Sequence, residues 1–171
     1  MQVKVSSVVL KGLLKLKSGH FFFKRLLSDT VEVGQKATLT RLITENDVKI
    51  FSEVSGDTNP VHTGNQAVVH GAFLNSLVSC IMGTKLPGPG SMVVSQSLKY
   101  PNPCMVGETV TVSVIVTGMK ADLIKCRYTV MAQLGEEINS SRPVLTGEAS
   151  LITKQNQQKR AAKNRDQKSS T

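Results

Sequence analysis

Residues 71–82 have the sequence Gly-Ala-Phe-Leu-Asn-Ser-Leu-Val-Ser-Cys-Ile-Met, a stretch without a charged residue. Its polar side chains are one asparagine and two serines. A helix that is apolar on almost every side is buried on most of its sides in a folded protein. We therefore predict a buried helix over 71–82 that ends at Gly83, with Cys80 buried inside it.

The chain after this segment is dominated by alternating apolar and polar residues. A turn-forming Leu-Pro-Gly-Pro-Gly sequence at 86–90 comes first. In 108–117 every second residue is valine, and 122–134 carries one continuous apolar face that includes Cys126 and Leu134. Alternation with a period of two predicts strands with one buried face. The predicted strands cover residues 34–42, 91–100, 108–117, 122–134 and 143–153.

A single buried helix that an antiparallel sheet must cover predicts an α+β fold. A second, shorter helix is predicted before it, because Thr44 and Asp47 have the spacing of a capping box. Val48, Phe51 and Val54 follow Thr44 at helical spacing. Gly56 is placed to end this helix, and the residues that follow it are therefore expected on a loop.

The positive charge of the chain is concentrated at its two ends. The 171 residues carry a formal net charge of +9, yet residues 29–153 hold nine basic and eleven acidic side chains. Residues 1–28 hold six basic residues and no acid, and residues 154–171 hold six basic residues and one acid. We therefore predict one domain, residues 29–153, between two basic segments.

The two basic segments differ in composition. Residues 1–28 mix lysine with serine, leucine and phenylalanine, and no apolar run in them is long enough for a secretory signal or a membrane span. We interpret 1–28 as a mitochondrial targeting segment. Residues 154–171 are rich in Lys, Gln, Asn and Ser, which predicts a disordered tail. The tail has no aromatic residue on which bases could stack, so we expect no nucleic-acid partner.

The three cysteines and three histidines are dispersed along the chain. The cysteines form neither a C-x-x-C pair nor a disulfide framework, which favours a reducing compartment. We expect Cys126, like Cys80, to be a buried apolar residue. Since no group has the spacing of a zinc site, we predict no metal.

The chemistry is concentrated in Ser-Gly-Asp-Thr-Asn-Pro-Val-His at 55–62. Asp57 can accept a proton, and His62 can donate through one ring nitrogen and accept through the other. Pro60 stiffens the segment between them, and Asn59 is expected to bond the loop backbone or to orient Asp57. An aspartate and a histidine held in this way can bind a water molecule and move its protons.

The motif Gly56-Asp57-x-Asn59-Pro60-x-His62 resembles the G-D-x-N-P-x-H signature of the R-specific enoyl-thioester hydratases, or MaoC-like dehydratases. The resemblance covers about residues 33–118 and extends loosely to 153. It implies a hot-dog fold, in which an antiparallel sheet wraps around a buried central helix. It also implies that Asp57 and His62 are catalytic, with Gly56 and Pro60 as structural support.

The resemblance also assigns roles around His70-Gly71. The Gly71 N–H is expected to stabilise the thioester oxygen, as in an oxyanion hole. Ser76 and Asn59 are expected to belong to the same oxyanion and substrate-binding group. His70 is expected to be a structural residue. The mitochondrial hydroxyacyl-thioester dehydratases are the members most similar in size and in the basic leader.

The activity implied is the reversible dehydration of (R)-3-hydroxyacyl thioesters to trans-2-enoyl thioesters, without metal or cofactor. The expected substrate carrier is acyl carrier protein or coenzyme A, and the expected location is the mitochondrial matrix, in fatty-acid synthesis. Because hot-dog sheets leave an edge that pairs with a second copy, we predict a homodimer. Lys85, Lys99 and Arg127 are candidates for steering an acidic carrier protein.

The chain departs from the family in one feature. Only seven residues lie between His62 and His70, about half the number usual in the family. Fully extended, seven residues span about 23–25 Å, so the link can close. The alternative function is a catalytically impaired protein that binds acyl thioesters. A hot-dog thioesterase and a nucleic-acid-binding protein are further alternatives.

Overall fold

The computed structural model describes residues 31–64, 66–120, 122–135 and 141–153. The predicted targeting segment 1–28 and the predicted tail 154–171 lie outside the described residues. In chain order the elements are β1 (Lys36–Leu42), α1 (Glu45–Ser55), the 3₁₀ turn η1 (Pro60–His62), α2 (Gly71–Thr84), β2 (Met92–Lys99), β3 (Thr109–Lys120), β4 (Leu123–Gln133) and β5 (Arg142–Ile152).

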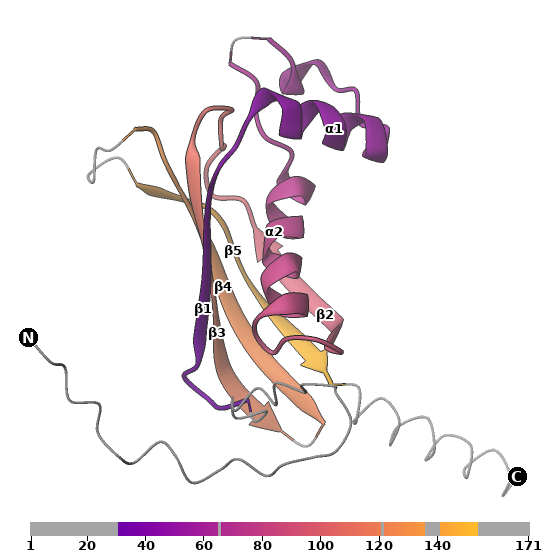
Figure 1. Cartoon of the computed structure of the whole chain (residues 1–171), viewed down its shortest axis with the longest axis vertical. Coiled ribbons are helices and arrows are strands. Elements are labelled where there is room, and N and C mark those ends of the chain that lie inside the picture. Colours follow the sequence, from indigo (N-terminus) through magenta and orange to yellow (C-terminus); the bar gives the residue numbers. More distant parts are fainter. Residues whose placement is uncertain (1–30, 65, 121, 136–140, 154–171) are drawn as a thin grey trace, which may run out of the picture.

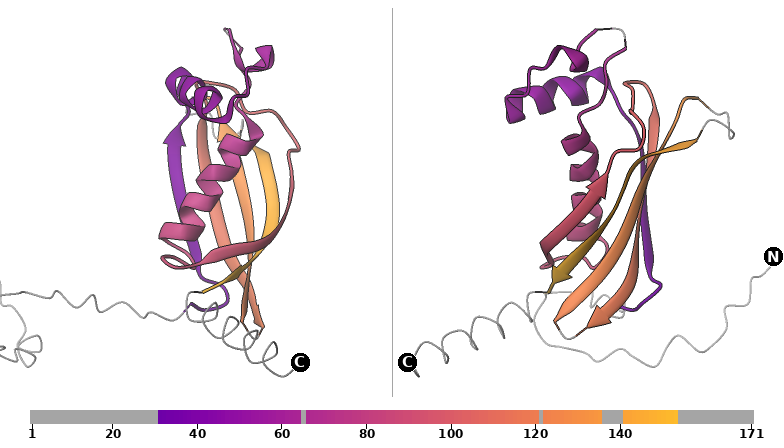
Figure 2. Two further views of the ribbon diagram at one scale, coloured as in Figure 1. Left: turned by 90° about the vertical axis from the view of Figure 1, so that its right-hand side faces the viewer. Right: turned by 180° about the vertical axis from the view of Figure 1, so that it is seen from behind.

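The five strands form one sheet in the order β1-β3-β4-β5-β2, and every neighbouring pair is antiparallel. The sheet curves around α2, which lies along its concave side, while α1 crosses one end (Figure 1). The turned views show the same wrapping of the strands around the central helix (Figure 2). The predicted α+β hot-dog fold is confirmed.

The core forms between one face of α2 and the inner faces of the strands. The four alternating valines from Val110 to Val116 on β3 are at most 1% exposed. They pack in one cluster with the buried residues of α2, which are Leu74, Leu77, Val78, Ile81 and Met82. The period-two pattern therefore identified the inner face of β3 correctly.

Helix α2 is less enclosed than its composition predicts. Cys80 is exposed, and with it Ala72, Ser76, Ser79 and Gly83. The prediction of a buried Cys80 was wrong because the sheet covers only one side of the helix. The predicted end at Gly83 was also wrong: α2 runs to Thr84, and the Lys85 N–H still bonds the Ile81 carbonyl.

Helix α1 begins and ends as predicted. The Thr44 Oγ1 accepts the Asp47 N–H at 3.2 Å, and the Asp47 carboxylate accepts the Thr44 N–H at 2.9 Å. Arg41 donates to Asp47 at 2.6 Å. Burial acts to raise the pKa of Asp47, but these hydrogen bonds from Thr44 and Arg41 outweigh it, so the pKa is lowered. Gly56 ends the helix with a φ of 74°.

The spacing of apolar residues wrongly predicted that two side chains would be buried. Val54 is 81% exposed on α1, although its spacing from Val48 suggested a shared buried face. Leu134 is 63% exposed because β4 ends one residue earlier, at Gln133. Cys126 is buried on β4 as predicted, and burial raises the pKa of its thiol to about 11.

Candidate active site

The Asp57 carboxylate lies on the loop between α1 and η1, with its side chain half exposed. Its Oδ1 accepts the Asn59 N–H at 3.2 Å. The Asn59 side chain in turn accepts the Val61 N–H at 3.3 Å and caps η1. Asn59 thus bonds the loop backbone, one of the two roles expected for it, and the second Asp57 oxygen is left facing His62.

The His62 ring is oriented by a backbone carbonyl. Its Nδ1 lies 2.6 Å from the Val68 oxygen. A carbonyl oxygen only accepts, so Nδ1 carries the donated hydrogen. In the neutral ring the free acceptor is then Nε2, which lies 3.7 Å from the Asp57 Oδ2. This separation is too long for a direct hydrogen bond, but one water oxygen can contact both atoms.

The short link between His62 and His70 closes by pairing with the segment before β3. The Val69 N–H bonds the Cys104 carbonyl at 2.8 Å, and the Val106 N–H bonds the Ala67 carbonyl at 3.0 Å. Val68 itself forms an antiparallel bridge with Met105. This pairing places the Val68 carbonyl where the His62 ring can reach it.

His70 is buried against the His62 ring. It is 2% exposed, and its ring is stacked on the His62 ring with the centroids 3.5 Å apart and 21° between the planes. The Nε2 lies 3.3 Å from the Ser52 Oγ, whereas Nδ1 is buried without a hydrogen-bond partner. The Phe51 ring also contacts His70, with the ring centroids 5.1 Å apart and 56° between the planes. His70 therefore supports His62 through ring contact.

Gly71 is the first residue of α2, so its N–H has no acceptor within the helix and lies at the positive end of the helix dipole. A Cβ at this position would lie 2.7 Å from the Tyr100 ring, so glycine allows Tyr100 to pack directly on the helix start. The oxyanion role of the Gly71 N–H stays a prediction.

Ser76 lies farther along α2 on the exposed face. Its Oγ donates to the Phe73 carbonyl at 2.7 Å. The residues that line the cavities beside His62 do not include Ser76 or Asp57. The structure thus gathers Asp57, His62, His70 and the Gly71 N–H at one end of α2, and leaves Ser76 outside this group.

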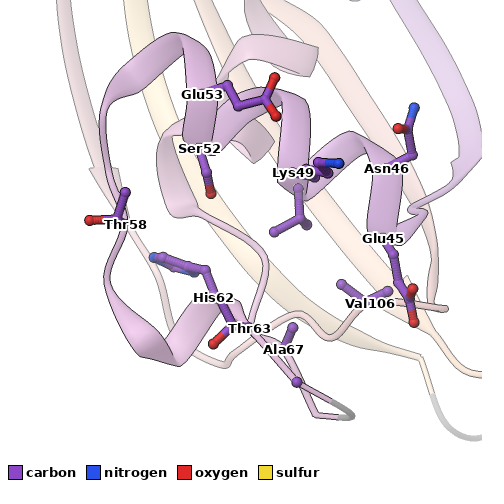
Figure 3. Close-up of a pocket in the computed structure, with 12 residues that line it drawn as sticks. Glu45, Asn46, Lys49, Ser52, Glu53, Thr58, His62, Thr63, Ala67 and Val106 are labelled. Atoms are coloured by element: carbon purple, nitrogen blue, oxygen red, sulfur yellow. The ribbon is translucent and has the colours of Figure 1, made fainter.

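Two cavities border His62. The first, which we call the α1 cavity, has a volume of about 640 Å³ and lies between α1 and the link after His62 (Figure 3). The second, the α2 cavity, has a volume of about 420 Å³ and contains Gly71, Ala72 and Tyr100. His62 lines both cavities.

Asp57, His62 and His70 also form a group of potential metal ligands, whose ligand atoms lie within 4.8 Å of one another. The two nearly parallel rings direct their in-plane lone pairs side by side, not toward one point, and His62 Nδ1 already bonds Val68. We therefore assign no metal to this group. The absence of a metal or cofactor stays a prediction.

Three contacts at the site could not be predicted from the sequence. They are the Val68 carbonyl on His62, the Ser52 hydroxyl on His70, and the Tyr100 ring on Gly71. Each joins residues that are distant in sequence or unremarkable in type. The short link between His62 and His70 was the one sequence feature that could have indicated the first two contacts, because it keeps His70 close to His62.

Comparison with known proteins identifies the family. A model of the MaoC like domain matches residues 28–137, which is more than half of the chain. The chain therefore belongs to the MaoC-like domain family. Its relatives are hydro-lyases, and the predicted enzyme class is confirmed.

Among curated proteins, the chain is 38% identical over 109 residues to an (R)-specific enoyl-CoA hydratase of Rhodospirillum rubrum, covering 58% of this chain and 72% of the relative. It is 32% identical over 110 residues to a mitochondrial 3-hydroxyacyl-[acyl-carrier-protein] dehydratase of Arabidopsis thaliana, covering 58% and 63%. The solved structure of an (R)-hydratase from A. caviae superimposes with a TM-score of 0.66 and 32% identity, covering 72% of this chain and 98% of that one.

No helix among the described residues is long and apolar enough to cross a membrane.

Proposed function

We propose that the protein catalyses the reversible hydration of trans-2-enoyl thioesters to (R)-3-hydroxyacyl thioesters. The observation that carries this proposal is the pair formed by His62 Nε2 and Asp57 Oδ2, 3.7 Å apart at one end of α2, where the Gly71 N–H lies. Both atoms are acceptors when Asp57 is ionised and His62 is neutral. A water molecule between them donates both hydrogens and turns a lone pair toward the substrate.

In the hydration direction, the water oxygen attacks C3 of the enoyl thioester, and the pair Asp57–His62 accepts the proton that the water loses. The π electrons of the C2–C3 bond move toward the carbonyl, whose enolate-like oxygen is stabilised by the Gly71 N–H. The accepted proton is then returned to C2. The proton content of the pair is unchanged, and the reverse sequence expels water from the 3-hydroxyacyl thioester.

The test is the loss of thioester-conjugated absorbance when the full chain is given trans-2-butenoyl-CoA. We expect Asp57→Asn and His62→Gln each to lower kcat by at least about 100-fold, with an unchanged melting temperature. Wild-type protein that binds butyryl-CoA but does not hydrate the enoyl thioester would instead support the alternative, an impaired acyl-thioester-binding protein.

We further propose acyl carrier protein as the natural carrier and the mitochondrial matrix as the location, in fatty-acid synthesis. The support is the Arabidopsis relative, a mitochondrial dehydratase of carrier-protein thioesters, together with the basic composition of residues 1–28. Of the three cations suggested to steer the carrier, Arg127 bonds Glu148 at 3.2 Å and Lys85 bonds the Thr38 carbonyl at 2.9 Å. Lys99 is exposed at the end of the edge strand β2.

To test which carrier the enzyme prefers, kcat/KM is measured for 2-butenoyl groups attached to acyl carrier protein and to coenzyme A. We expect a higher kcat/KM for the carrier-protein substrate, falling as salt rises because steering between exposed charges is screened. Equal and salt-independent values would contradict the choice of carrier. Import of a fluorescent protein fused to residues 1–28 into mitochondria would test the location.

A homodimer through β2 is the proposed assembly. β2 lies at one edge of the sheet and has three exposed apolar residues in succession, Met92, Val93 and Val94. An exposed apolar edge strand in a stable protein is commonly paired with another strand. The exposed side of α2, which has small residues and no charge, runs beside this edge (Figure 1), so a second copy can cover both.

A further inference from the structure

The Val68 carbonyl that orients His62 belongs to a pairing of two short segments, residues 67–69 of the link and residues 104–106 before β3. Val68 and Met105 lie opposite each other in an antiparallel bridge. Their neighbours make the hydrogen bonds of this pairing, so the N–H and carbonyl groups of Val68 and Met105 point away from the pair. On one side, the Val68 carbonyl faces His62 Nδ1 at 2.6 Å. On the other, the Met105 N–H needs a separate acceptor.

That acceptor is a buried carboxylate. The Met105 N–H donates to Glu108 Oε2 at 2.8 Å, and Glu108 is 3% exposed. Arg142 donates to both carboxylate oxygens at 2.7 and 3.0 Å, and its Nη2 also donates to the Pro103 carbonyl at 3.0 Å. Glu108 directly precedes β3 and Arg142 begins β5, at the end of the sheet that α1 crosses (Figure 1). The ion pair therefore holds Pro103 and Met105 against the sheet.

We propose that Glu108, supported by Arg142, is a positioning residue for His62. The proposal rests on the proposed function, in which His62 Nε2 accepts a hydrogen from the water molecule. The carboxylate holds Met105, the bridge holds Val68 opposite it, and the Val68 carbonyl keeps the ring hydrogen of His62 on Nδ1. Because a neutral imidazole carries one N–H, this arrangement keeps Nε2 free to accept.

The geometry of the ion pair suits it to hold this segment. Hydrogen bonds between a guanidinium and a carboxylate are roughly twice as strong as those between neutral groups, and two parallel bonds fix the plane of the carboxylate. A shift of Met105 would leave its N–H and a buried carboxylate oxygen without full hydrogen bonding, which costs free energy. The link after His62 has only seven residues, so Val68 follows the segment with which it pairs.

Two substitutions of Glu108 test the proposal in the full chain, with trans-2-butenoyl-CoA as substrate. Glu108→Ala removes the acceptor of the Met105 N–H. We expect its kcat to fall about tenfold with KM within about twofold, because a misplaced catalytic group costs rate more than binding. Glu108→Gln is the conservative variant, since its amide oxygen can still accept the Met105 N–H, and it should lose only about threefold in kcat.

Val114→Ala is the matched control for a loss of stability. Val114 is fully buried in the middle of β3 and pairs with Tyr128 on β4. Its truncation leaves a cavity in the core and should lower the melting temperature. The position is six residues beyond Glu108, which is about 20 Å along an extended strand, so kcat should stay within about twofold of wild type.

The tautomer of His62 shows directly whether its ring is still held. Protonated and unprotonated ring nitrogens differ in their nitrogen NMR chemical shifts, and the chain has only three histidines. The spectrum of His62→Gln identifies the His62 signals by their loss. At about pH 8, where imidazole is neutral, we expect wild type and Val114→Ala to carry the hydrogen on Nδ1. Glu108→Ala should show a mixture of both tautomers.

A Glu108→Ala protein that melts at a lower temperature but keeps kcat and the Nδ1 tautomer would overturn the proposal, because the ion pair would then stabilise the fold alone. The same holds if kcat falls in Glu108→Ala while the tautomer does not change, or if Val114→Ala loses both equally. Should Glu108→Ala not fold, Glu108→Gln decides by the same two measurements, and an unchanged kcat and tautomer would overturn the proposal.

The tautomer separates this proposal from the proposed reaction, because it is measured without turnover. If the wild-type chain hydrates nothing, but His62 changes tautomer in Glu108→Ala and not in Val114→Ala, the positioning role stands and the reaction fails. If the chain hydrates 2-butenoyl-CoA and His62 keeps its tautomer in both Glu108 variants, the reaction stands and the positioning role fails.

Discussion

The rings of His62 and His70 lie face to face, with centroids 3.5 Å apart and planes 21° from parallel. The Val68 carbonyl fixes one edge of the His62 ring, and His70 fixes its face. Together they leave the Nε2 of His62 directed toward the Asp57 carboxylate. We therefore propose that His70 is a positioning residue, which acts through the orientation of His62.

Substitution at position 70 should separate ring contact from hydrogen bonding. His70→Phe keeps an aromatic face against His62 and removes the buried unpartnered Nδ1, so we expect kcat to stay within about threefold. His70→Ala removes the support and should lower kcat about 30-fold with little change in KM, because a misplaced catalytic group costs rate more than binding. Steady-state kinetics and melting temperatures check this. Equal losses of kcat in both variants would contradict a role based on stacking.

The ion pair between Glu108 and Arg142 should make stability depend on acidic pH. Glu108 is 3% exposed, and Arg142 donates to its two oxygens at 2.7 and 3.0 Å. Burial acts to raise the Glu108 pKa, but the Arg142 bonds and the Met105 N–H outweigh it, so the pKa lies below its usual 4.5. A carboxyl whose folded pKa is lowered stabilises the fold above its unfolded pKa, and that stabilisation is lost as pH falls through the folded value.

The test is urea denaturation of wild type and Glu108→Gln across acidic pH. At pH 7 we expect the substitution to lower the free energy of unfolding by about 2–3 kcal/mol. This difference should shrink as the pH falls below 4.5 and through the lowered folded pKa, since wild-type Glu108 then becomes protonated as well. A difference that stays constant over this range would show that the charge of Glu108 does not stabilise the fold.

Local patterns predicted the elements that local chemistry determines. The capping box of Thr44 and Asp47, the left-handed Gly56 and the alternating valines of β3 were all found as expected. Each depends on residues within a few positions of one another, so the sequence alone contains the information. The same holds for the loop that carries Asp57 and His62, which follows from Gly56 and Pro60.

Contacts across long separations could not be predicted in this way. Glu108 and Arg142 pair over 34 positions. Glu108 directly precedes β3 and Arg142 begins β5, so their pairing depends on the register of the sheet. Cys80 was misjudged because an apolar composition does not say how many sides of a helix the sheet will cover. The stacking of His70 on His62 depends on how the short link pairs with residues 104–106.

Glycine at position 71 should be required to keep the first residue of α2 in place against Tyr100. In Gly71→Ala the new Cβ would lie 2.7 Å from the Tyr100 ring, so the ring or the start of α2 must move. We expect kcat to fall about tenfold, because the N–H that we propose faces the thioester oxygen is displaced. Gly83→Ala, in the same helix, meets no atom within 4 Å and is the matched control.

The control should keep kcat and should raise stability by up to about 1 kcal/mol, since alanine favours the helix. The double variant Gly71→Ala with Tyr100→Leu provides a further check, because the smaller side chain leaves room for the Cβ and should restore part of the rate. An undiminished kcat in Gly71→Ala would mean that the helix start tolerates the shift and that the Gly71 N–H is not tightly positioned.

The three cysteines should report on the proposed dimer. Burial and the neighbouring Glu108 raise the pKa of the Cys104 thiol to about 12, and burial raises that of Cys126 to about 11, so neither forms a thiolate readily. Cys80 lies on the exposed side of α2. In the native chain a disulfide reagent should therefore modify only Cys80, and all three thiols should react after unfolding.

A dimer through β2 and α2 should cover Cys80 and slow its modification. Val93→Lys places a charge on the β2 edge, where strand pairing would have to bury it, so we expect a monomer by light scattering and at least about tenfold faster labelling of Cys80. Val54→Lys is the control, since Val54 is 81% exposed on α1, away from this edge. A wild-type monomer, or equal labelling rates in a dimeric wild type and in Val93→Lys, would rule out an interface that includes the exposed side of α2.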